Sequence, residues 1–120
     1  MLYDLANFQA LVRDNQWCYL NERRPKNTCE KYDLTNDDVE QLLCALTPDD
    51  FQKTVPNCRV ENAFRGCDYV DADQYSIYWH EDSKRRRSFF TRETIDFSLK
   101  IAIVTDSNGD VAGLVTFHAS

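Results

Sequence analysis

An alternation of apolar and polar residues from Ile95 to Ile103 constrains the fold of this chain more than any other feature. Large apolar side chains occupy the odd positions, and Asp96, Ser98 and Lys100 stand between them. Successive side chains of a strand point to opposite faces of a sheet, so the run predicts a strand with a core on one face only. The other face is then free for chemistry.

A second strand, over residues 111–118, follows a turn and forms a hairpin with the first. A two-residue loop would turn Val115 and Phe117 towards the polar face of the hairpin. A three-residue loop over 107–109, with Gly109 in the left-handed region, keeps the apolar residues of both strands on one face. We therefore predict the three-residue loop.

Polar residues of the two strands meet in this register. Lys100 lies across from Thr116, and Ser98 lies across from His118, so the four side chains share the face away from the core. Histidine can transfer a proton near neutral pH, and lysine can stabilise charge that develops on a phosphate. The patch therefore has the composition of a phosphoryl-transfer site that uses no metal ion.

Signals for helices come before signals for strands in the rest of the chain. We predict helices over 4–14, 35–46 and 47–55, a short strand or extended link over 17–22, a loop over 23–27, and strands over 64–70, 74–80 and 88–92. This order is typical of an α+β fold. We expect a single domain, residues 1–120, in which helices pack on one face of a twisted antiparallel sheet.

Two threonines mark the starts of the second and third helices. Thr35 stands before an aspartate-rich first turn, whose charge favours the positive helix terminus, and such a cap contributes roughly 1 kcal/mol. Thr47 is followed by Pro48 at the first helical position, which is a strong start signal. Lys53 would lie near the end of this third, short helix.

The net charge of −6 argues against non-specific attraction to nucleic acid, but the charge is unevenly distributed. Residues 1–50 carry five basic and ten acidic side chains, whereas residues 51–100 carry nine basic and eight acidic ones. The second half also holds a dense positive run, formed by Lys84, Arg85, Arg86 and Arg87, with Arg92 close by. The run is either the solvated tip of a hairpin or a phosphate-binding segment.

Cysteine usage and hydropathy bear on location and on cofactors. The five cysteines never form Cys-x-x-Cys, so we expect reduced thiols in a cytoplasmic protein and no structural zinc site. No apolar run approaches the roughly 20 residues that span a bilayer, and the N-terminus lacks the features of a signal peptide. No glycine-rich phosphate loop is present, so we expect neither a nucleotide cofactor nor a metal ion.

Several short segments resemble the MqsR family of bacterial toxins. Residues 46–55, Leu-Thr-Pro-Asp-Asp-Phe-Gln-Lys-Thr-Val, are similar to the family's Leu-Ser/Thr-x-x-Asp-Phe-Tyr-Lys-Ser-Met motif, which also follows a helix. Residues 97–101, Phe-Ser-Leu-Lys-Ile, resemble its Val-Tyr-Leu-Lys-Ile/Phe strand. Residues 114–118, Leu-Val-Thr-Phe-His, resemble its closing Leu-Ile-Val-Ser-Phe-Lys.

The resemblance implies a RelE-like fold and an endoribonuclease that cleaves mRNA without a metal ion. Cleavage would follow attack of the RNA 2′-hydroxyl on the adjacent phosphate, and a cognate antitoxin would neutralise the toxin in the bacterial cytoplasm. Matching the motifs implies these catalytic candidates: Lys53 and Lys100 as the family lysines, His118 in place of a terminal lysine, Ser98 in place of a tyrosine, and Asp68 from Gly-Cys-Asp as the counterpart of a Trp-Gln-Asp aspartate. Lys84 to Arg87 and Arg92 would contact the RNA backbone.

A second hypothesis is a non-catalytic protein-binding module on the same fold. Its acidic helical half would bind a basic partner, and the missing family glutamine and tyrosine favour this interpretation. A third, a small acidic inhibitor that mimics nucleic acid, ranks lower because the basic run interrupts the negative surface that mimicry requires.

Overall fold

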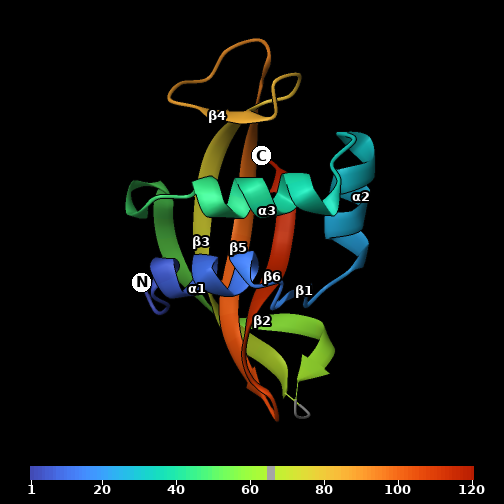
Figure 1. Ribbon diagram of the computed structural model, residues 1–120, viewed down its shortest axis with the longest axis vertical. Coiled ribbons are helices and arrows are strands. Elements are labelled where there is room, and N and C mark those ends of the chain that lie inside the picture. The colour runs from blue at the N-terminus through green and yellow to red at the C-terminus, as the bar shows by residue number, and fades with distance from the viewer. Residues whose placement is uncertain (65–66) are drawn as a thin grey trace.

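The computed structural model describes residues 1–64 and 67–120, and the side chains of residues 62–64, 67–68 and 106 are outside its description. The described residues form an α+β fold with three α-helices and a six-stranded sheet (Figure 1). The predicted strand over 64–70 includes residues 65–66, which lie outside the described residues. In chain order the elements are α1 (Leu5–Arg13), β1 (Trp17–Tyr19), α2 (Arg23–Lys31), α3 (Asn36–Ala45), η1 (Pro48–Asp50), β2 (Phe51–Phe64), β3 (Cys67–His80), β4 (Arg85–Arg87), β5 (Thr94–Asp106) and β6 (Gly109–Ala119).

The sheet is mixed rather than antiparallel throughout. Its strand order is β1-β6-β5-β3-β2, and β4 pairs with the C-terminal end of β3. β1 runs parallel to β6, with Trp17 opposite Ala112, while the other neighbouring strands are antiparallel. The prediction of an antiparallel sheet is therefore wrong at this edge. The long connection from β1 to β6 includes all the intervening elements, which permits parallel pairing.

Helices α1 and α3 cross one face of the sheet and bury their apolar sides against it (Figure 1). α1 begins after Asp4, whose carboxylate accepts a hydrogen bond from the Asn7 backbone N–H at 3.1 Å. Thr35 caps α3, as predicted, and forms a capping box with Asp38. The main core lies between the two layers, and its buried side chains include Phe8, Val39, Leu42, Leu43, Tyr75, Trp79, Phe97, Leu99 and Ile101.

Residues 23–27, which we predicted as a loop, form the first part of α2. Pro25 lies in the first turn, where its missing N–H interrupts no helical hydrogen bond. The helix stands beside β6 (Figure 1), and the buried Thr28 hydroxyl donates to the Phe117 carbonyl at 2.7 Å. α2 therefore occupies the sheet edge that the short strand β1 leaves uncovered.

The third predicted helix is only the single 3-10 turn η1. Thr47 does mark its start, and the Thr47 backbone N–H donates to the Asp50 carboxylate at 2.8 Å. The chain then enters β2 at Phe51, whose ring packs edge-on against Tyr75 with centroids 5.7 Å apart. Lys53 consequently lies on a strand and not near the end of a helix.

The β5–β6 hairpin pairs its polar residues as predicted. Ser98 is opposite His118, and Lys100 is opposite Thr116. Because directly opposed residues of antiparallel strands point to the same face, these four side chains share one face of the sheet. That face is turned away from α1 and α3, and we call it the outer face.

The turn of this hairpin differs from the prediction. A two-residue loop, 107–108, is closed by the pairing of residue 106 with Gly109, whose φ is 116°. Ile101 pairs with Leu114, so Val115 is an extra residue that forms a β-bulge before the polar pairs. The predicted three-residue loop is wrong because the offset of one residue is taken up at Val115 and not at the turn.

Only part of the outer face is free, contrary to the prediction. β2 leaves its edge of the sheet and crosses the lower end towards β1 and α2 (Figure 1). Beneath it lies a second apolar cluster, in which Val60, Ala72, Ala102, Val115 and Leu20 are buried. The polar residues of the β5–β6 hairpin lie above this cluster, on the half of the face that stays open.

Candidate functional site

A row of polar side chains crosses four strands on the open half of the outer face. Lys53 of β2 pairs with Gln74 of β3. Gln74 pairs in turn with Lys100 of β5, and Lys100 pairs with Thr116 of β6. Neighbouring strands are about 4.8 Å apart, so the backbones of the two lysines lie roughly 10 Å apart, on either side of Gln74. We call Lys53, Gln74, Lys100 and Thr116 the polar row.

A second line of residues runs beside the polar row, one pleat away. Ser76 pairs with Ser98, and Ser98 pairs with His118. Ser98 is only 7% exposed, and its hydroxyl accepts a hydrogen bond from Gln74 Nε2 at 3.4 Å. Ser98 is thus placed to orient Gln74.

His118 is half-buried at the end of this second line. Its Nδ1 lies 3.2 Å from the Ala119 carbonyl oxygen, which can only accept a hydrogen bond. The contact favours the tautomer with the proton on Nδ1, so Nε2 is the nitrogen that can accept a proton from a bound molecule. The sequence predicted the position of His118 correctly, and the tautomer follows from the structure.

Asp73 lies on the opposite face of the sheet and fixes the backbone of the strands that carry the polar row. Its fully buried carboxylate accepts hydrogen bonds from the Thr54 hydroxyl at 2.8 Å and from the backbone N–H groups of Leu2 and Tyr3, both at 2.9 Å. These bonds join β2, β3 and the N-terminal segment next to Lys53. No sequence motif pointed to Asp73, because its partners lie in two segments distant from it along the chain.

Lys100 lies at the border between the polar row and the second apolar cluster. Burial raises the pKa of the Cys58 thiol, and the positive charge of Lys100 opposes this rise, which places the two side chains near each other. Ala102, the next residue of β5 on the outer face, is fully buried in the cluster. Apolar surface therefore flanks the Lys100 ammonium group on one side.

The positive run at 84–87 does not form a continuous strip for RNA. Lys84 Nζ donates to the Tyr32 and Asp33 carbonyls at 3.3 and 2.7 Å, at the end of α2. Arg86 binds the Asp50 carboxylate with both terminal nitrogens, at 2.8 and 2.9 Å. These two cations hold the β3–β4 hairpin against the helical layer.

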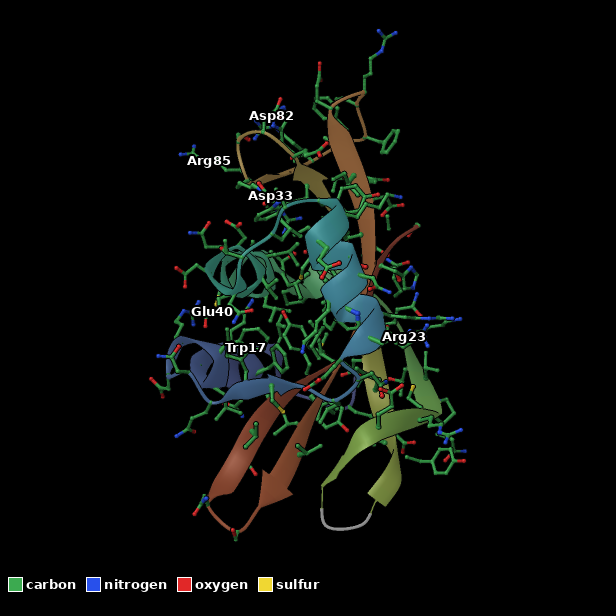
Figure 2. The ribbon with its side chains drawn as sticks, turned by 90° about the vertical axis from the view of Figure 1, so that its right-hand side faces the viewer. Trp17, Arg23, Asp33, Glu40, Asp82 and Arg85 are labelled. Carbon is green, nitrogen blue, oxygen red and sulfur yellow. The ribbon has the colours of Figure 1, made fainter. Side chains whose placement is uncertain are left out.

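The other predicted RNA contacts have different surroundings. Arg85 and Arg92 are exposed, and Arg87 lies beside Tyr78. Figure 2 shows Arg85 at the upper end of the molecule, on the side of the helical layer. The predicted return strand 88–92 is wrong, because strand pairing ends at Arg87 and none of the residues 88–92 belongs to a strand. Asp68 belongs to β3, but its side chain lies outside the described residues.

A cationic concavity that the sequence did not predict adjoins the polar row at Thr116. Its volume is about 660 Å³. We call it the basic groove, and its lining includes Arg23, Arg24 and Asn27 of α2, Arg59 and Glu61 of β2, and Thr116 of β6. Figure 2 shows Arg23 at the lower end of α2, on the side towards β2. The arginines escaped prediction because two come from a supposed loop and the third from a distant strand.

Asn21 fixes the floor and one wall of the basic groove. Its Nδ2 donates to the Arg59 carbonyl at 2.9 Å and to the Val115 carbonyl at 3.0 Å. Its Oδ1 accepts from the Glu61 backbone N–H at 2.7 Å. The side chain of Asn21 thereby ties the far part of β2 to the bulge in β6.

Aromatic side chains lie beyond the opposite end of the open face. Tyr78 pairs with Asp96 on the outer face, and the ring of Phe90 packs edge-on against Tyr78 with centroids 5.9 Å apart. Phe89 and Phe90 are 67% and 63% exposed. Exposed aromatic rings of this kind are able to stack on nucleic-acid bases.

The described residues contain no cluster of His, Cys, Asp and Glu that could hold a metal ion. None of the described helices is long and apolar enough to cross a membrane. Comparison with known proteins gives no match: no family model, no curated protein and no solved structure is similar to this chain at a significant level. The geometry of the outer face is therefore the principal guide to function.

Proposed function

We propose that the chain is a toxin-type endoribonuclease that cleaves mRNA on the outer face and is neutralised by a cognate antitoxin in the bacterial cytoplasm. The observation that carries the proposal is the polar row. Lys53 and Lys100 flank the Gln74 amide on one open face, and His118 stands one pleat away. A phosphate above Gln74 would lie within reach of both ammonium groups. The resemblance of residues 46–55 and 97–101 to the MqsR motifs supports the same two lysines and a RelE-like fold.

The arrangement suits transesterification of RNA without a metal ion. The 2′-oxygen forms a bond to phosphorus, and the bond from phosphorus to the 5′-oxygen breaks, which leaves a 2′,3′-cyclic phosphate and a 5′-hydroxyl. His118 takes the proton of the attacking 2′-hydroxyl, or supplies one to the departing 5′-oxygen, and water makes the other transfer. Lys53, Lys100 and the Gln74 amide stabilise the charge on the phosphorane oxygens.

The test is an RNA oligonucleotide incubated with the purified protein in EDTA, with products identified by mass spectrometry. We expect fragments ending in a 2′,3′-cyclic phosphate, and no cleavage where 2′-deoxynucleotides replace the ribonucleotides. Lys100→Met should lower kcat by about 100-fold or more, as for loss of one transition-state contact. His118→Ala should lower it by about 100- to 10,000-fold.

Lys26→Gln is the matched control for these variants. Lys26 is exposed on α2, pairs with Glu22 at 3.2 Å, and belongs neither to the polar row nor to the residues that line the basic groove. This variant should cleave at the wild-type rate. RNA that stays intact at high protein concentration, together with harmless expression in bacteria, would refute the proposal.

A protein-binding module is the second candidate, and the position of the acidic side chains favours it. Figure 2 shows Glu40, Asp33 and Asp82 on the side of the helical layer, away from β2. Asp37 and Glu40 also line a shallow concavity of about 470 Å³ between α1 and α3. Binding of a basic peptide that Asp37→Asn weakens, beside intact RNA, would support this function over cleavage.

A further inference from the structure

We infer that the basic groove binds the phosphate backbone of single-stranded RNA that extends from the polar row. Thr116 belongs to both features, because it ends the row and lines the groove. A strand whose phosphate lies above Gln74 would therefore enter the groove as it passes Thr116. The inference rests on the proposed function for the identity of the strand, while the groove itself is defined by residues outside the catalytic row.

The charges of the groove have no partners within the described part of the protein. The side chains of Arg23, Arg24 and Arg59 make no hydrogen bond or ion pair among the described residues, and Glu61 is the only acidic residue in the groove lining. By contrast, Lys84 and Arg86 are engaged by groups of the helical layer. In a chain of net charge −6, three guanidinium groups that surround one concavity and have no partner among the described residues indicate an anionic ligand.

The backbone of the groove is fixed before any ligand binds. Asn21 joins the Arg59 segment to Val115, and the Thr28 hydroxyl holds α2 to the Phe117 carbonyl. The Leu20 N–H also donates to the Leu114 carbonyl at 2.9 Å. A preformed site loses less conformational entropy on binding, which favours a functional surface over a chance gathering of arginines.

The two ends of the open face suit a single strand. Proteins that bind single-stranded nucleic acid combine a cationic groove along the backbone with aromatic rings that stack on bases. Here the arginines lie beyond Thr116, and Tyr78 with Phe90 lies at the other end of the face. Arginine also matches phosphate geometry through two parallel hydrogen bonds, which a lysine cannot provide.

The probe is a fluorescent 12-nucleotide single strand with 2′-O-methyl groups throughout, which cannot undergo attack by a 2′-hydroxyl. Its Kd is measured by anisotropy from low to moderate salt. Each lost phosphate contact should lower the slope of log affinity against log salt by about 0.7, which corresponds to about fivefold weaker binding at 0.1 M salt. We expect this change for Arg59→Gln and about twice this change for the Arg23→Gln, Arg24→Gln double variant.

Two further variants exclude indirect effects. Lys26→Gln removes one positive charge from the same helix outside the groove, and it should leave the salt slope at the wild-type value. Arg59→Lys keeps the charge and should retain most of the slope while binding more weakly. Unchanged slopes for Arg59→Gln and for the double variant, or an equal change for Lys26→Gln, would overturn the inference.

The same measurements separate this inference from the proposed cleavage. Arginine-dependent binding of the 2′-O-methyl strand, beside intact unmodified RNA in EDTA, would refute the nuclease proposal and leave the groove as a nucleic-acid site. Cleavage of unmodified RNA with the same KM in wild type and Arg59→Gln would refute the groove and leave the nuclease proposal intact.

Discussion

Arg86 donates a hydrogen bond from each terminal nitrogen to the Asp50 carboxylate and a further one to the Ala45 carbonyl at 2.6 Å. The guanidinium group thus joins β4, the C-terminal end of α3 and the turn that leads into β2. A cation at this end of a helix also interacts favourably with the helix dipole. The contact connects the hairpin with the strand that carries Lys53.

Arg86→Ala should lower the free energy of unfolding by roughly 2–3 kcal/mol, because it removes charged hydrogen bonds and leaves the Asp50 carboxylate without its cationic partner. The exposed neighbour Arg85 is the matched control, and Arg85→Ala should change stability by less than about 0.5 kcal/mol. Urea denaturation of both variants provides the measurement. Equal free energies of unfolding for wild type and Arg86→Ala would show that the Arg86–Asp50 pair makes no net contribution to stability.

Acid should weaken the same contact. Burial by itself would raise the pKa of Asp50, but hydrogen bonds from Arg86 and Thr47 outweigh it and hold this pKa below its ordinary value of 3.8. A carboxyl group with a lowered folded-state pKa stabilises the fold above its unfolded-state pKa, and this contribution is lost as the pH falls through the folded-state pKa.

The stability difference between wild type and Asp50→Asn should therefore be largest near neutral pH and shrink below about pH 4. Denaturant titrations at pH 7, 5, 4 and 3 measure it. If the free energies of unfolding of wild type and Asp50→Asn differ by the same amount at all four pH values, the lowered pKa of Asp50 would be contradicted.

Gly113 leaves room for the Leu20 side chain, which would have to shift if residue 113 carried a Cβ. A Cβ at position 113 would lie 2.5 Å from Leu20 Cδ1 and 2.8 Å from its Cγ. Gly113→Ala should cost about 1–3 kcal/mol through overpacking. Leu20→Ala in the same chain should recover part of that loss, which a double-mutant cycle would detect.

Gly109→Ala provides the contrast, because nothing lies within 4 Å of a Cβ there but φ is 116°. Its cost should come from backbone strain and should not depend on Leu20. A Gly113→Ala cost that is likewise independent of Leu20 would count against the packing explanation.

Asp73→Asn should lower the free energy of unfolding by roughly 2–3 kcal/mol, since an amide can accept fewer of the bonds from Leu2, Tyr3 and Thr54. The N-terminal segment should also become more sensitive to protease, because one of the two oxygens that accept from its backbone N–H groups is replaced by an amide nitrogen. Thr54→Val should cost less and leave the N-terminal segment protected. Identical proteolysis of wild type and Asp73→Asn would argue against this anchoring role.

Signals that depend on near neighbours predicted the structure well. The cap at Thr35 and the apolar stripe that follows it specify α3, and period-two alternation places Ser98 and Lys100 on the outer face. Each of these features needs only one helical turn or one strand pair. The polar pairing with Thr116 and His118 was derived from the three-residue loop, and it holds because the bulge at Val115 supplies the offset of one residue that the loop was expected to supply.

Predictions failed where distant segments decided the outcome. Pro25 suggested a loop, yet contacts with the edge of β6 support a helix there, and Thr28 supplies one of them. Phe51 lies within the predicted helix over 47–55, but pairing with β3 makes it a strand residue. The basic groove could not be predicted, because Asn21 and Arg59 meet only after β2 has crossed the sheet.

The bulge at Val115 lets β6 keep its polar pairs with β5 and also contribute a side chain to the second apolar cluster. Deleting this residue would leave a hairpin whose pairing is continuous from the turn to the C-terminus, with Lys100 still opposite the threonine and Ser98 still opposite the histidine. Backbone pairing alone therefore does not require Val115. Its side chain completes the second apolar cluster, and its displaced carbonyl receives the Asn21 amide. One inserted residue thus adds lining to the basic groove without disturbing the neighbouring polar pairs.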